Sequence, residues 1–131
     1  IYLIREQLEK LACRCAAEHF DQIPMDRLKQ LLEEIQVSET QQDVPRRLNL
    51  VRTFFFTIFN ASKKESLLRI LSNLWDLSQQ YRRHFSSVHY RMVYQACETR
   101  DAEGLVRVFD EIHAFASSNL IPLLREEENK P

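Results

Sequence analysis

The scarcity of chain-breaking residues is the feature that most constrains the fold of this sequence. Its 131 residues include one glycine and four prolines, so strong turn signals are few. A sandwich or barrel of short strands needs such a signal about every dozen residues. Helices need far fewer, and the hydrophobic residues, 44% of the chain, recur mostly at helical spacing. The sequence therefore predicts an all-α fold, an antiparallel bundle of about six helices.

Six segments carry the helical pattern, and polar stretches or prolines separate them. The helices are predicted over residues 1–20, 24–37, 45–59, 64–85, 89–99 and 101–124. Short connections make consecutive helices antiparallel neighbours, which is the arrangement of a bundle. The chain shows no internal repeat, no low-complexity segment and no linker. Residues 1–131 are therefore expected to form a single domain.

Local signals place several helix ends. Pro24 and Pro45 suit the first turn of the second and third helices, because proline has no backbone N–H to leave unpaired there. Asp101 can cap the sixth helix by accepting a hydrogen bond from its first turn. Residues 38–43 are polar and unpatterned, and they are predicted to form a flexible loop.

Apolar residues at helical spacing predict which helix faces are buried. One stripe on the first helix and the apolar side of the fourth helix are both expected to face the core. They consist of Leu3, Ile4, Leu8, Leu11, Ala12, Cys15 and Ala16, and of Leu67, Leu68, Leu71, Leu74, Trp75 and Tyr81. Phe54, Phe55, Phe56 and Phe59 cover more than half the circumference of the third helix. At least one of them is expected to face a cavity or a subunit interface.

Composition and missing motifs exclude several classes of function. The formal net charge of −1 gives no general attraction to nucleic acid. No apolar run approaches the roughly 18 residues of a membrane span. The single glycine cannot build a phosphate-binding loop, and no nucleophile elbow or metalloprotease motif is present. We expect a protein that is not an enzyme and has no catalytic residues.

The chain has three cysteines, an odd and sparse set that does not suggest a disulfide framework. A reduced, cytoplasmic protein is therefore favoured. The chain begins at Ile1 rather than Met, so we interpret it as a piece of a longer protein.

Several stretches are similar, in order and spacing, to one known family. They are residues 3–9 followed by 16–18, Phe54 followed by 61–68, and 96–103. These stretches, beginning with the Arg-x-x-Leu-Glu pattern at Arg5, resemble the FCD domain. That domain is the all-helical effector domain of FadR-type regulators in the GntR family. The resemblance covers nearly the whole chain.

Most members of that family bind a divalent metal through an aspartate and three histidines. In this chain the four corresponding positions are Val51, Phe55, Tyr90 and Ile112. Aliphatic and phenyl side chains cannot ligate, and a neutral phenol is a poor ligand for common divalent ions. His89 and His113 each lie one position away, and one step turns a helix by about 100°. The resemblance therefore implies a domain that uses neither a metal nor another cofactor.

Two interpretations of the central positions remain open. In the first, an apolar cavity persists and binds a small apolar or acidic organic effector. Its site would be formed by Arg5, Val51, Phe55, Tyr90 and Ile112, with the Tyr90 hydroxyl giving direction and Arg5 pairing with a carboxylate or phosphate. In the second, the side chains fill the space, and the domain is a protein-interaction or dimerisation module without a small ligand.

The resemblance also implies the partners of this domain. An upstream winged helix-turn-helix domain, absent from this chain, would contact DNA, and the regulator would act as a homodimer in the cytoplasm. Membrane association is not expected.

Overall fold

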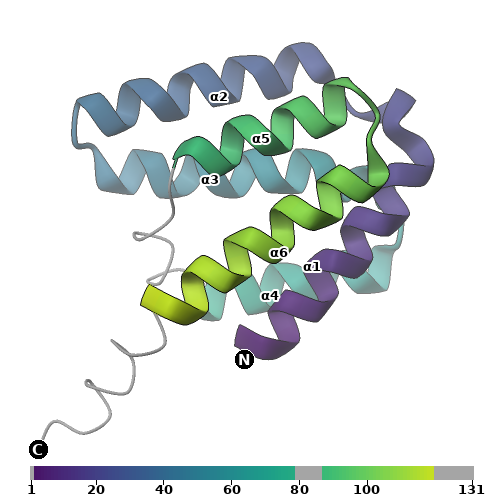
Figure 1. Ribbon diagram of the computed structural model, residues 1–131. Coiled ribbons are helices and arrows are strands. Elements are labelled where there is room, and N and C mark those ends of the chain that lie inside the picture. Colours follow the sequence, from purple (N-terminus) through teal and green to yellow (C-terminus); the bar gives the residue numbers. More distant parts are fainter. Residues whose placement is uncertain (1, 79–86, 120–131) are drawn as a thin grey trace, which may run out of the picture.

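The computed structural model describes residues 2–78 and 87–119 (Figure 1). This part of the chain folds into six α-helices and two short 3₁₀ segments, with no strand, so the predicted all-α fold is confirmed. The elements are α1 (Tyr2–Ala16), η1 (Ala17–Gln22), α2 (Met25–Thr40), α3 (Val44–Phe59), η2 (Asn60–Ser62), α4 (Glu65–Leu77), α5 (Ser87–Glu98) and α6 (Ala102–Asn119). Of the predicted helices, residues 79–85 and 120–124, with Tyr81, lie outside the described residues.

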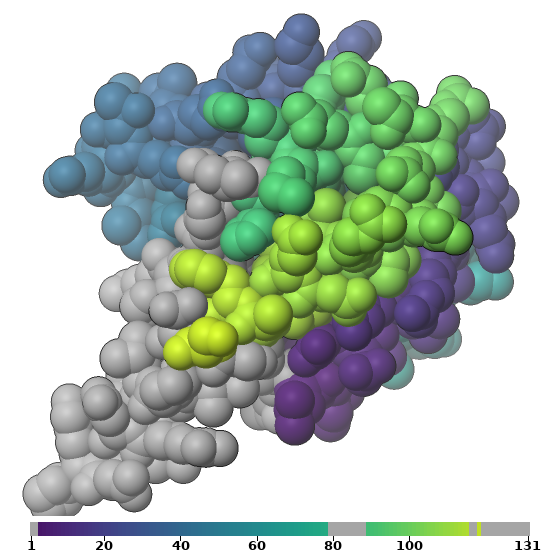
Figure 2. All heavy atoms as spheres, viewed as in Figure 1, coloured from purple at the N-terminus to yellow at the C-terminus, as the bar shows by residue number. Residues whose placement is uncertain are grey.

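The helices pack as two interlocking groups. α2 packs on α3 and α5, while α1 packs on α4 and α6 (Figure 1). α6 follows α5 after a short turn and also contacts it, so it joins the two groups. Figure 2 shows α1, α5 and α6 side by side on one face of the molecule. No helix of the described chain is both long and apolar enough to cross a bilayer.

Local capping explains two of the helix starts. The Asp43 carboxylate accepts a hydrogen bond from the Arg46 amide, and Pro45 occupies the first turn of α3, as predicted. The Asp101 carboxylate accepts a 2.9 Å hydrogen bond from the Gly104 amide at the start of α6, which confirms the predicted cap. Both helices carry residues of the core, so these caps help to position it.

Three predicted boundaries were wrong. The fourth helix was predicted to run to residue 85, but α4 ends at Leu77, because Ser78 has non-helical dihedrals. The first α-helix ends at Ala16 rather than near Phe20, because His19 has non-helical dihedrals and the chain tightens into η1. Residues 38–40 continue α2 instead of starting a loop. Ser38, fully buried, donates to the Ile35 carbonyl, and Thr40 donates to that of Gln36, so both hydroxyls are satisfied within the helix.

The orientation of α1 is the largest departure from the sequence prediction. Of its predicted buried stripe, only Ala12 and Ala16 are buried; Leu8 and Cys15 are half-buried, and Leu3, Ile4 and Leu11 are 45–68% exposed. The inner face instead carries Arg5 and Glu9, each 1% exposed. This arrangement is stable because the two charges face each other and find further polar partners inside the fold.

The fourth helix matches its prediction more closely. Leu71 and Trp75 are fully buried, and Leu67, Leu68 and Leu74 are half-buried. Residues from all six helices contribute to one continuous hydrophobic core.

Candidate functional site

The centre of the core is a group of aromatic rings around Phe55, here called the aromatic chamber. Phe55 lies on α3 and is 2% exposed. Its ring centroid lies 5.4–6.2 Å from five other rings, which come from α3, α4, α5 and α6. These rings belong to Phe54, Phe59, Trp75, Tyr90 and Phe109. Most of the pairs meet edge to face, the arrangement that aromatic quadrupoles favour.

The structure brings the predicted site residues together. Val51, Phe55, Tyr90 and Ile112 are each at most 4% exposed and belong to the same core cluster. The Phe55 and Tyr90 rings are in contact, with their centroids 5.7 Å apart. Residues from α3, α5 and α6 thus converge at the chamber, although they lie up to 61 positions apart in sequence.

Arg5 reaches the chamber through Trp75. Its guanidinium carbon lies 4.2 Å from the centroid of the Trp75 ring, close enough for a cation–π interaction. The Trp75 ring in turn lies 5.5 Å from that of Phe55. Arg5 is therefore a buried residue at the edge of the chamber.

Phe56 is the aromatic residue of α3 that reaches the surface. It is half-buried, whereas Phe54, Phe55 and Phe59 are buried. Its ring packs against that of Trp75, and the Arg52 guanidinium lies 5.4 Å from the ring centroid.

A buried polar network, which the sequence analysis did not identify, adjoins the chamber. Glu9 of α1 accepts a 2.9 Å hydrogen bond from Arg5 Nε and lies 2.8 Å from Nε2 of His113 on α6. Arg5 also donates to the Ser78 hydroxyl at 3.0 Å. The spacing of Arg5 and Glu9, four residues apart on one helix, is the signal that was available in the sequence. We name Arg5, Glu9, Ser78 and His113 the buried polar network.

The pKa of Glu9 follows from this position. Burial by itself raises the pKa of a carboxyl group, but the positive Arg5 and the hydrogen bond with His113 outweigh that effect. The pKa of Glu9 therefore lies below its ordinary value of 4.5, and the side chain carries a negative charge in the folded protein at neutral pH.

The central positions do not fit a divalent metal ion. Val51, Phe55 and Ile112 offer only carbon atoms, and Tyr90 offers one phenol oxygen. Within residues 2–78 and 87–119, no group of three or more His, Cys, Asp and Glu side chains is placed to hold a metal. His113 is turned toward Glu9, and the half-buried His89 packs against Phe115 with ring centroids 5.8 Å apart.

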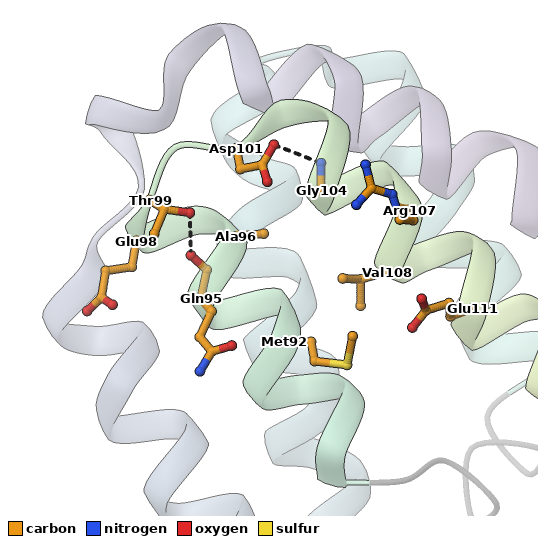
Figure 3. Close-up of a pocket in the computed structure, with 10 residues that line it drawn as sticks. All are labelled: Met92, Gln95, Ala96, Glu98, Thr99, Asp101, Gly104, Arg107, Val108 and Glu111. Atoms are coloured by element: carbon orange, nitrogen blue, oxygen red, sulfur yellow. Dashed lines mark hydrogen bonds between the residues drawn. The ribbon is translucent and has the colours of Figure 1, made fainter.

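A surface groove of about 540 Å³ lies between the end of α5 and the start of α6 (Figure 3). Met92 and Val108 face each other across it, and the charged side chains around it, including Arg107 and Glu111, are exposed. None of the predicted site residues lines this groove. Its open, mixed surface has no buried polar group to orient a ligand, so the chamber remains the better candidate site.

Comparison with known families identifies this arrangement. The sequence profile of the FCD domain matches residues 1–114. This chain belongs to the FCD domain family. FCD domains are the effector and dimerisation domains of GntR-type transcription regulators, and the family is regulatory rather than enzymatic.

The fold of this FCD domain is similar to that of a solved structure, E. coli McbR/YncC. The two chains superpose with a TM-score of 0.77 over 96% of this chain, at 24% sequence identity. The match covers 63% of the McbR/YncC chain, so this chain spans less than two thirds of that protein. No curated protein matches in sequence.

Proposed function

We propose that this FCD domain senses a small apolar organic molecule at the aromatic chamber, without a metal, within a dimeric DNA-binding regulator. The observation that carries the proposal is the convergence of Val51, Phe55, Tyr90 and Ile112 at one buried centre. These are the positions at which most FCD domains hold their metal. Their side chains supply apolar surface and a single hydroxyl, a composition typical of pockets for apolar ligands.

The buried polar network favours an apolar effector over an acidic one. Arg5, the only cationic residue among the predicted site residues, already holds the Glu9 carboxylate at 2.9 Å. An acidic effector would have to compete with this internal carboxylate for Arg5. An apolar effector would leave the pair intact and would lose nothing to that competition.

The same contacts offer a route by which an effector can act on the rest of the regulator. Phe55 contacts Trp75, and Trp75 contacts Arg5 on α1. In the proposed regulator, an upstream winged helix-turn-helix domain precedes α1, so a shift of Trp75 would be transmitted toward the DNA-binding domain in the cytoplasm. Such coupling requires that the regulator have two conformations and that the effector bind them with different affinity.

A second function is favoured by the density of the chamber. Phe55 has five ring neighbours within 6.2 Å, which is how a filled core packs. If the space is filled, the domain is a protein-interaction and dimerisation module that binds no small molecule.

Thermal-shift measurements with fatty acids, acyl conjugates and divalent metals distinguish the two functions. A ligand at 100 times its dissociation constant stabilises the folded state by about 2.7 kcal/mol. The sensor predicts a rise in Tm with at least one apolar class and none with metals. The absence of any shift favours the interaction module, and a shift with metal alone contradicts the proposal.

Tyr90→Phe tests whether the ligand is held at the chamber. The variant removes one hydroxyl group, so a ligand that hydrogen-bonds to it should bind about 5- to 10-fold more weakly, corresponding to about 1 kcal/mol. Tyr94→Phe is the matched control. Tyr94 lies on the same helix, but it is only half-buried, and its hydroxyl interacts with Glu98 instead. Equal effects of the two variants would place the ligand elsewhere.

A further inference from the structure

Three rings in contact lead from the surface of the protein to the aromatic chamber. The Trp75 side chain is fully buried, and its ring centroid lies 5.5 Å from that of Phe55 at the centre of the chamber. The half-buried Phe56 ring also packs on Trp75, with the centroids 5.6 Å apart and the rings edge to face. Phe56 therefore helps to keep Trp75 out of water, and it is the outermost ring of the three.

Side chains close the seam between α3 and α4. The backbones of these two helices do not pack closely on each other, although both helices pack on α1. Phe56 of α3 and Trp75 of α4 meet across the seam. A side chain can change its rotamer while its helix stays in place. Opening this seam therefore requires less rearrangement than separating two closely packed helices such as α2 and α3.

Arg52 holds the Phe56 ring in position. The two residues are four apart on α3, so they lie on the same side of the helix. The Arg52 guanidinium carbon lies 5.4 Å from the Phe56 ring centroid, within range of a cation–π interaction. The guanidinium also donates a 2.6 Å hydrogen bond to the Ser72 hydroxyl and pairs with the Asp76 carboxylate, both on α4. We call Arg52, Ser72 and Asp76 the latch, because together they span the seam over the Phe56 ring.

The latch is accessible to water. The side chains of Arg52 and Asp76 are 28% and 59% exposed, whereas those of the Arg5–Glu9 pair are each 2% exposed. An ion pair that water reaches contributes little to stability and is weakened by salt. Such a pair breaks transiently while the rest of the fold persists, which a buried pair does only at a large cost in free energy.

We propose that Phe56 is a gate to the aromatic chamber and that the latch holds this gate closed. When the latch breaks, the Phe56 ring turns away from Trp75, and a small apolar molecule passes between α3 and α4. An effector needs such an opening, because Val51, Phe55, Tyr90 and Ile112 are each at most 4% exposed. The inference rests on the proposed function for the molecule that the gate admits, but the opening itself is measurable without any ligand.

Acrylamide quenching of Trp75 fluorescence tests the gate. Trp75 is the only tryptophan in the chain, so its emission reports access to this one position. Arg52→Ala removes the latch but leaves the Phe56 and Trp75 rings. Its bimolecular quenching constant, obtained from fluorescence lifetimes, should exceed that of the wild type by about 2- to 5-fold, because loss of an exposed cation–π contact favours the open state by about that factor. Asp76→Ala breaks the latch from α4 and should also raise the constant.

A double variant and a matched control separate the latch from a general loss of stability. Arg52→Ala with Asp76→Ala should be quenched no more than Arg52→Ala alone, because the two substitutions remove the same ion pair. Lys10→Ala is the control, because it breaks a comparably exposed ion pair, with Asp110, between α1 and α6. Its quenching constant should equal that of the wild type. Circular dichroism establishes that each variant is folded, and Arg52→Gln replaces Arg52→Ala if that variant is not.

Three outcomes would overturn the gate. They are wild-type quenching in both Arg52→Ala and Asp76→Ala, an equal rise in Lys10→Ala, and strictly additive rises in the double variant. The thermal-shift screen on the same variants separates the gate from the proposed function. Raised quenching in variants that show no ligand shift supports the gate and counts against the sensor. A ligand shift with unchanged quenching supports the sensor and overturns the gate.

Discussion

Glu9 determines how α1 can sit against the core. Its carboxylate is buried between Arg5 and His113, and the three side chains come from residues up to 108 positions apart. The charged and polar groups of this network stabilise one another at a buried position, where a charge without a partner would be costly. The buried polar network therefore fixes the rotation of α1 about its axis, and it joins α1 to both α4 and α6.

Glu9→Gln should lower the free energy of unfolding by about 2–4 kcal/mol, because it removes the buried negative charge that faces Arg5. Urea denaturation followed by circular dichroism measures the change. Glu6→Gln is the control on the same helix. Glu6 is partly exposed and lies 3.7 Å from Lys10 and 3.9 Å from His113, so its loss should cost less than about 1 kcal/mol. Similar losses in both variants would contradict the role given to Glu9.

The lowered pKa of Glu9 predicts a pH dependence. Below the ordinary pKa of 4.5, the unfolded chain binds a proton at Glu9 that the folded chain still excludes. Stability contributed by Glu9 is therefore fully present above pH 4.5 and is lost as the pH falls through the folded value. Unfolding free energies measured between about pH 3 and pH 7 should fall more steeply in acid for the wild type than for Glu9→Gln. Parallel curves would show that the pKa of Glu9 is not lowered.

At the scale of the elements, α1 shows why an apolar stripe does not always mark the buried side. Its stripe is as regular as that of an ordinary core helix, yet Ile4 and Leu11 are exposed while Arg5 and Glu9 are buried. Periodicity reports that a helix has two unlike faces, but it does not say which neighbour each face meets. Ile4 and Leu11 of α1 are exposed because the buried polar network occupies the inner side of the helix.

The cap of α6 gives a test at this scale. A Cβ atom added at Gly104 would lie 2.3 Å from the Asp101 carboxylate, so the chain's single glycine leaves room for the capping side chain. Asp101→Ala should destabilise the fold by about 1 kcal/mol through loss of the cap.

Gly104→Ala completes the test as a double-mutant cycle. In the wild-type background, the higher helix propensity of alanine should be offset by displacement of the Asp101 cap. The free energy of unfolding should then change little. In the Asp101→Ala background it should stabilise the protein by about 0.5–1 kcal/mol. Denaturation of the four proteins measures the coupling, and strictly additive effects would argue against the steric account.

At the scale of the whole molecule, the aromatic chamber is connected to α1 through Trp75 and Arg5. Arg5 and Trp75 are buried at the edge of the chamber, whereas Ile4 on α1 and Leu77 on α4 are exposed. A rotation of α1 or α4 that accommodates a ligand would therefore also move residues at the surface of the domain. In the proposed regulator, such a movement would give a direct route from effector to DNA-binding geometry.

Metal removal is the corresponding prediction for the whole molecule. Because the central positions offer one phenol oxygen and no imidazole or carboxylate, dialysis against EDTA should leave Tm unchanged. The protein as purified should also carry no stoichiometric zinc or nickel. Calorimetry before and after dialysis, with elemental analysis of the same samples, measures both. A loss of several degrees on dialysis, or one ion per chain, would reveal a metal site.

The sequence by itself determined the helical class, the order of the elements and the helix starts set by Pro45 and Asp101. These features are local, because a cap or a breaker acts within one turn of helix. The family motifs also identified residues that meet at the chamber.

Only the tertiary structure decided which side of α1 is buried and where Glu9 finds its partners. His113 lies 104 residues from Glu9, and Ser78 lies 73 residues from Arg5. The burial of a charge depends on such distant partners. Removing a charged side chain from water is costly unless the folded protein supplies hydrogen bonds and an opposite charge. The four-residue spacing of Arg5 and Glu9 places the two side chains on one side of α1, but it does not say whether that side is buried.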